Sequence, residues 1–111
     1  MARVALMCPD LLFGSKVEGA LSAAGHEVTR FESEASARSG AADADVLVVD
    51  LTDASSGGVA LGGVEGVPTL GFYSHVDVDT RRAAEAAGFD MVVPRSRMAR
   101  ETAALVERLA A

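Results

Sequence analysis

Side chains that could do chemistry follow four short apolar segments of this 111-residue chain. Asp50 comes directly after the apolar run 46–49, and its carboxylate could react or pair with a cation. The thiol of Cys8 could act as a nucleophile, and the guanidinium of Arg95 could hold an anion. The candidate site consists of Cys8, Pro9, Asp10, Asp50, Thr52, Tyr73, Ser74, His75 and Arg95.

Structural explanations compete with catalytic ones at each of these positions. A free cysteine is most often a small buried hydrophobe, so we expect Cys8 to be buried. For Asp50 we favour a structural ion pair with Arg95. A lone histidine on a loop, such as His75, is usually solvated. The glycine pairs at 57–58 and 62–63 are not followed by Lys-Ser/Thr, so they do not form a phosphate-binding P-loop.

Strand-like and helix-like segments alternate along the whole chain and must position these side chains. The expected strands are 4–7, 28–31, 46–49, 69–73 and 91–93. Five βα units with short connections predict an α/β fold in three layers, with a parallel sheet between helices. The first choice of strand order is the flavodoxin-like 2-1-3-4-5, in a single domain covering residues 1–111. In such a sheet, ligands bind at the carboxyl ends of the strands, where all the candidate residues lie.

The helix boundaries are predicted from capping residues. The expected caps are Asp10, Asp77 or Asp79, and Ser96 at helix starts, and Gly25 and Gly88 at helix ends. The segment 32–44 is rich in Ala, Ser and Glu, and 54–66 contains five glycines. We therefore expect the second and third helices to be short.

Composition excludes several classes of protein. Half of the residues are apolar and the formal charge is −6, which argues against disorder and against nucleic-acid binding. The apolar start of the chain is too short for a signal peptide or a membrane span. One cysteine and two separated histidines make neither a disulfide nor a metal-ligand set. We expect a cytoplasmic domain with no cofactor.

Four stretches of the sequence resemble receiver domains of bacterial two-component signalling. They are Val48-Val49-Asp50-Leu51, Val67-Pro68-Thr69-Leu70, the segment 82–90 and Ala24-Gly25-His26-Glu27-Val28. The resemblance covers the whole chain, although the segments on either side of Asp50 are several residues shorter than in the family. It implies that Asp50 is equivalent to the aspartate that accepts a phosphoryl group from a histidine kinase.

The chain departs from the family where the metal would bind. In receivers, two acidic residues after the first strand hold the Mg²⁺ that bridges aspartate and phosphate. Cys8 and Pro9 occupy those places, and neither side chain supplies a hard oxygen ligand. Asp10 lies one position later and is a poor substitute.

Three further receiver positions are also changed. The threonine or serine after the fourth strand falls at Tyr73, with Ser74 on the opposite side of the pleat. The lysine after the fifth strand falls at Arg95, and the aromatic residue of that strand falls at Val92. Only Asp50 is unchanged, so we do not expect Mg²⁺-dependent phosphorylation.

These observations favour a stand-alone, degenerate receiver that is not an enzyme and acts by binding a protein. The resemblance implies pairing through the fourth helix, fifth strand and fifth helix, as in a homodimer, with Arg81, Arg82, Arg97 and Arg100 at the rim. One alternative is a small anionic-ligand binding protein or enzyme that uses the crevice at the strand ends. Another is a receiver that still accepts phosphate through Asp50 and Asp10.

Overall fold

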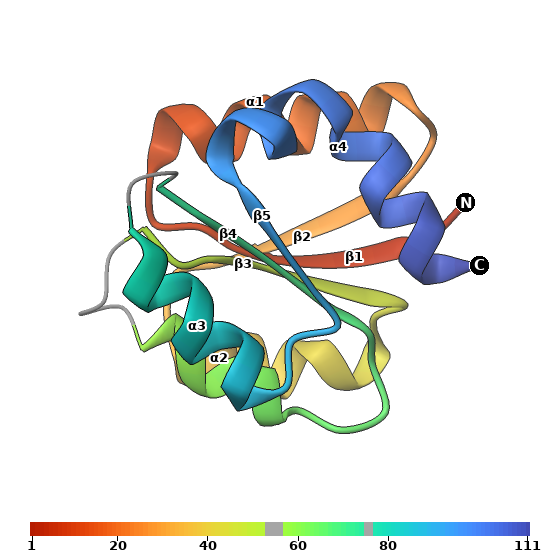
Figure 1. Cartoon of the computed structure of the whole chain (residues 1–111). Helices are drawn as coiled ribbons and strands as arrows, with labels where there is room; N and C mark the ends of the chain where they lie inside the picture. Colours follow the sequence, from red (N-terminus) through yellow and green to blue (C-terminus); the bar gives the residue numbers. More distant parts are fainter. Residues whose placement is uncertain (53–56, 75–76) are drawn as a thin grey trace.

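Five parallel strands form the centre of the computed structural model, which describes residues 1–52, 57–74 and 77–111 (Figure 1). The strands are β1 (Arg3–Met7), β2 (Glu27–Phe31), β3 (Val46–Asp50), β4 (Thr69–Tyr73) and β5 (Met91–Pro94). Their order is β2-β1-β3-β4-β5, and every neighbouring pair is parallel. The predicted α/β class and strand order are confirmed.

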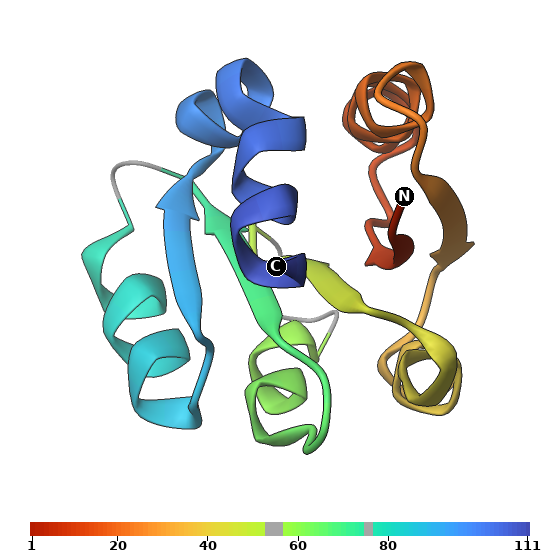
Figure 2. The same ribbon diagram turned by 90° about the vertical axis from the view of Figure 1, so that its right-hand side faces the viewer.

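Helices cover both faces of the sheet (Figure 2). One face carries α1 (Leu11–Ala23) and α4 (Arg95–Ala110), and the other carries α2 (Glu34–Gly40), η1 (Ala41–Asp43), η3 (Gly58–Gly63) and α3 (Val78–Ala87). The second and third helical segments are short, as predicted. In η3 the glycines allow only a 3₁₀ helix, because glycine costs about 1 kcal/mol per position relative to alanine in an α-helix. No helix in the described ranges is both long and apolar enough to span a membrane.

Most of the predicted helix caps are confirmed. The side chains of Asp10 and Asp77 accept hydrogen bonds from the backbone N–H of the third residue of α1 and α3, respectively. Gly88 has a φ of 107° at the end of α3, in the left-handed region that favours glycine. The prediction that Ser96 caps the last helix is wrong. Pro94, extended at φ −64° and ψ 150°, already occupies the cap position, so Ser96 falls inside the first turn of α4.

Two apolar clusters, one on each side of the sheet, make up the core. Val48 and Leu70, at the centre of β3 and β4, have 0% exposure, as their continuous apolar runs predicted. Beneath α1 and α4, Phe72 packs against Phe13 with 5.1 Å between ring centroids. The sheet thus forms a rigid platform whose carboxyl edge carries the candidate site.

Candidate functional site

Asp50 lies at the end of β3, and its carboxylate is bound by the chain's own donors. One oxygen, Oδ1, accepts hydrogen bonds from the backbone N–H of Thr52 at 2.8 Å and from its hydroxyl at 2.6 Å. The other, Oδ2, accepts from the thiol of Cys8 at 3.4 Å. Asp50 is only 3% exposed. Both oxygens therefore have a neutral partner, and the carboxylate is buried.

Cys8 comes directly after β1 and is buried, as predicted. Burial, together with the negative charge of Asp50 and the hydrogen bond to it, raises the pKa of the Cys8 thiol to about 12. The thiol is thus protonated near neutral pH. The thiolate is the reactive form of cysteine, so this environment disfavours reactivity, and the thiol donates a hydrogen bond to Asp50.

Arg95 pairs with Asp10 across the starts of α4 and α1. A guanidinium nitrogen of Arg95 lies 2.9 Å from Oδ2 of Asp10, and Oδ1 of Asp10 accepts from the backbone N–H of Phe13. The guanidinium also lies over the ring of Phe13, 4.2 Å from its centroid. The Phe13 amide and the Arg95 charge lower the pKa of Asp10. In the alternative hypothesis, an anionic ligand would bind the guanidinium of Arg95. One side of that guanidinium is bound to Asp10.

The predicted ion pair between Asp50 and Arg95 is wrong. Arg95 begins α4, which packs against α1, so its side chain reaches the partly exposed carboxylate at the start of α1. Asp50 lies deeper and is already bound by Thr52 and Cys8. A guanidinium placed there would lose its water, a cost that a single buried ion pair does not readily offset.

The carboxyl-edge cluster is made of Cys8, Asp10, Asp50, Thr52 and Arg95. The structure brings these five predicted residues together in two groups, Asp50 with Cys8 and Thr52, and Asp10 with Arg95.

Tyr73, another predicted site residue, lies apart from this cluster. Tyr73 is 5% exposed and packs in the core beneath α2, η3 and α3, on the opposite face of the sheet from Cys8. Pro9 is exposed, and Ser74 is half-buried and accepts from the backbone N–H of Asp77 through its carbonyl. His75 lies outside the described residues. Among the described contacts, no hydroxyl of β4 reaches Asp50.

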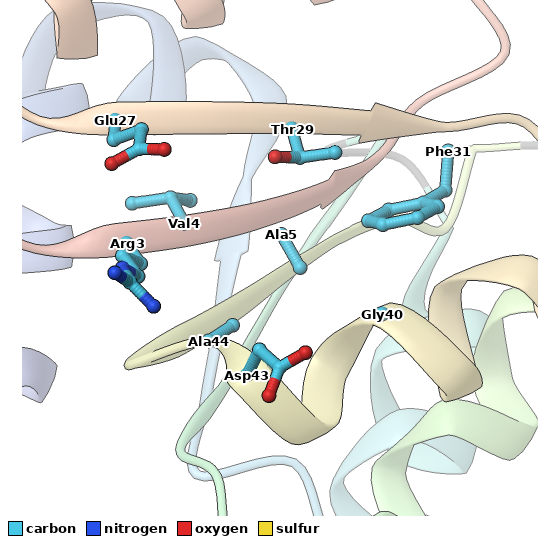
Figure 3. Close-up of a pocket in the computed structure, with 9 residues that line it drawn as sticks. All are labelled: Arg3, Val4, Ala5, Glu27, Thr29, Phe31, Gly40, Asp43 and Ala44. Carbon is cyan, nitrogen blue, oxygen red and sulfur yellow. The ribbon is translucent and has the colours of Figure 1, made fainter.

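The larger of two surface cavities described lies away from the carboxyl-edge cluster. It is a groove of about 360 Å³ between β1, β2 and the α2–η1 segment (Figure 3). Its lining residues are Arg3, Val4, Ala5, Glu27, Thr29, Phe31, Gly40, Asp43 and Ala44. It arises because the short α2 leaves part of this face of β2 uncovered. No candidate site residue lines it.

Comparison with solved structures identifies the fold. A putative response regulator from Chloroflexus aurantiacus superposes with a TM-score of 0.86 and 19% identity, covering 98% of this chain and 97% of that one. The receiver domain of NarL from Mycobacterium tuberculosis gives 0.77 and 22%, with 98% and 95% covered. The chain has the receiver fold. NtrX from Brucella abortus gives 0.83 and 20%, but this chain spans only 27% of its length and 98% of its own. No protein-family model matches the sequence, and no curated protein is significantly similar to it.

The receiver fold implies a magnesium site, which the residues present do not fit. A receiver domain of a Pseudomonas aeruginosa sensor kinase, 16% identical, has a magnesium ion coordinated in its active-site cleft, with a TM-score of 0.79 and 98% and 97% of the two chains covered. Here Cys8 is a protonated thiol and Pro9 has no side-chain donor atom. The oxygens of Asp10 and Asp50 are bound within the chain. No group of three His, Cys, Asp or Glu in the described ranges is arranged to hold a metal.

Two residues that support the site were not in the predicted set. Phe13 provides both the backbone donor for Asp10 and the ring beneath Arg95. Arg30, on β2, crosses α1 and donates to the backbone carbonyl of Cys8 at 3.2 Å. A Cβ at Gly14 would lie 2.1 Å from the Arg30 guanidinium, so this crossing requires glycine there. In the sequence, Gly14 inside a helical pattern was the available sign that another group, here the Arg30 side chain, passes close to this helix. For Phe13, an ordinary core position, no signal existed.

Proposed function

We propose that this protein is a non-catalytic regulatory module of receiver fold that acts by binding a protein partner, without Mg²⁺-dependent phosphorylation. One observation carries the proposal: Asp50, the equivalent of the phosphoacceptor, is buried and hydrogen-bonded through both oxygens to Cys8 and Thr52.

Electrostatics support the loss of phosphoryl chemistry. Transfer of a phosphoryl group depends on cations that neutralise the charge on its equatorial oxygens. Replacement of the acidic pair by Cys8 and Pro9 removes two carboxylates that would hold the metal. The remaining cation of the cluster, Arg95, is paired with Asp10. A phosphoryl group on Asp50 would also have to displace the hydrogen bonds from Thr52.

The proposed binding face comprises α3, β5 and α4. They correspond to the fourth helix, fifth strand and fifth helix predicted from the sequence, and β5 is an edge strand. Arg81 and Arg82 are exposed on α3, and Arg100 is exposed on α4. Among the described residues, Arg81 and Arg97 pair with glutamates one helical turn away, at 3.7 and 3.3 Å. Such surface pairs contribute little, so a partner's carboxylates can replace them at small cost.

Affinity capture with point variants tests this proposal. The wild-type chain and Asp50→Asn should retain the same partner to the same extent, with or without Mg²⁺. The double variant Arg81→Glu, Arg82→Glu should lose it, because the rim charge is inverted. Lys16→Glu, a charge inversion on the exposed side of α1, is the matched control and should retain the partner. Partner binding that depends on Asp50 and Mg²⁺ would contradict the proposal.

A further inference from the structure

His26 connects three parts of the molecule at the amino edge of the sheet. It lies between α1 and β2, and its side chain is 7% exposed. Ring nitrogen Nδ1 accepts a hydrogen bond from the backbone N–H of Ala2 at 3.0 Å. Ring nitrogen Nε2 lies 2.8 Å from Oε2 of Glu107 on α4. Figure 1 shows the start of the chain and the end of α4 side by side at this edge.

These contacts define the protonation state of the ring. A backbone N–H can only donate, so Nδ1 of His26 must carry no proton. The single proton of the neutral ring then lies on Nε2 and is donated to the Glu107 carboxylate. A second proton at Nδ1 would face the N–H of Ala2, donor against donor. The same proton would turn the contact with Glu107 into a full ion pair.

The charges around the ring come from several elements. Glu107 belongs to α4, and Asp45, just before β3, lines a cavity of about 330 Å³ together with His26. Asp45 itself accepts from the backbone N–H of Arg3 at 2.8 Å. Met1 and Ala111 line the same cavity. Acidic groups thus offset a positive ring, whereas the N–H of Ala2 opposes it.

We propose that His26 is a pH-sensitive latch that holds Ala2 when the ring is neutral and releases it when the ring is protonated, while Glu107 stays bound. Ala2 is buried, and its carbonyl accepts from the backbone N–H of Glu27 at 2.9 Å, next to the first residue pair of β1 and β2. Release of Ala2 therefore loosens the start of this strand pair. The latch is at the opposite edge of the sheet from Asp50 and does not depend on the proposed function.

Amide exchange and ring-nitrogen NMR on the whole chain test the latch. Over a pH series, ring-nitrogen NMR should place the ring proton on Nε2 for as long as the ring carries a single proton. Where NMR shows the ring doubly protonated, protection of the Ala2 and Glu27 amides, corrected for intrinsic rates, should fall about fivefold, as expected for loss of one hydrogen bond. Protection of amides in the centre of β3 should not change.

Two variants show which of the two histidine rings causes the pH dependence of amide protection. His75→Gln removes the other histidine of the chain and should keep the whole effect. His26→Gln should remove the pH dependence of protection. If His26→Gln fails to fold, ring-nitrogen NMR of the wild-type protein still tests the proposal. A proton on Nδ1 of the singly protonated ring, or equal protection in the singly and doubly protonated forms, would overturn the proposal.

Discussion

Different interactions stabilise the centre of the sheet and its carboxyl edge: apolar packing at the centre and specific hydrogen bonds and ion pairs at the edge. In β3 and β4 every residue is buried, and from Val46 to Val49 each side chain is apolar and packs in one of the two core clusters. Three residues further along, the chain reaches Thr52 and the carboxyl-edge cluster, where each polar group is bound to a specific partner.

The difference explains why a shared fold does not require a shared site. Burial is non-directional, so any apolar residues of suitable size maintain the sheet. A phosphorylation site requires particular donors at particular positions. Cys8 and Pro9 therefore lie at the edge of an intact apolar sheet, where they affect what the edge can bind.

Removing a central aromatic ring should have the largest effect on stability. Phe72 has 0% exposure and contacts Phe13, so we expect Phe72→Ala to lower the free energy of unfolding by about 3–5 kcal/mol, through lost burial and a cavity. Chemical denaturation measures this. Leu12→Ala, at a side chain 87% exposed, is the control and should change stability by less than about 0.5 kcal/mol. Equal effects at both positions would contradict the packing described.

Removing the Asp50 carboxylate should have an intermediate effect. Asp50→Ala leaves the donors of Cys8 and Thr52 without their acceptor, which we expect to cost about 1–3 kcal/mol in the same denaturation experiment. Asp50→Asn should cost less, because its carbonyl oxygen still accepts from Thr52. A stabilised Asn variant would show instead that Asp50 is held in a strained, functional state.

The buried thiol should make stability depend on alkaline pH. An unfolded cysteine ionises near pH 8.5, whereas the pKa of Cys8 in the folded chain is about 12. The unfolded state therefore loses its proton first. The stability difference between the wild type and Cys8→Ala should be constant below about pH 8.5 and shift against the wild type above it. Thermal melts of both proteins across this range would reveal it, and parallel curves throughout would contradict the burial of the thiol.

The smallest effect is expected at the exposed ion pair. The pKa of Asp10 is lowered by the Phe13 amide and by Arg95, so its charge stabilises the fold above the ordinary carboxyl pKa, and this contribution is lost as the pH falls through the lowered value. Asp10→Asn retains a good helix cap and removes only the charge. Melts from neutral to acidic pH should show the two proteins converging, and salt should narrow the gap. A gap unaffected by pH and salt would exclude the ion pair as its cause.

The order of elements was predictable from the sequence because it depends on repeating local signals. Runs such as 46–49, capping residues such as Asp10 and Asp77, and the stop at Gly88 each act within a few residues. The carboxyl edge was also predictable as the location of the site, since it follows from chain direction in a parallel sheet.

Pairing within the site was not predictable in the same way. Whether Arg95 binds Asp10 or Asp50 depends on how α1 and α4 pack against each other, which no local sequence signal specifies. The crossing of α1 by Arg30 depends on the same packing. Tyr73 followed the alternation of β4 onto the other face, so its place in the chain did not bring it near Asp50.

Exposure to acetyl phosphate and millimolar Mg²⁺, followed by intact-mass measurement, tests the central claim most directly. A receiver domain that carries the acidic pair, treated in parallel, shows that the reagent is active. The mass of this protein should remain unchanged, because the carboxylate of Asp50 is bound by Cys8 and Thr52 and no metal site adjoins it among the described residues. Appearance of one phosphoryl mass that Asp50→Asn abolishes would contradict the account and identify a working receiver.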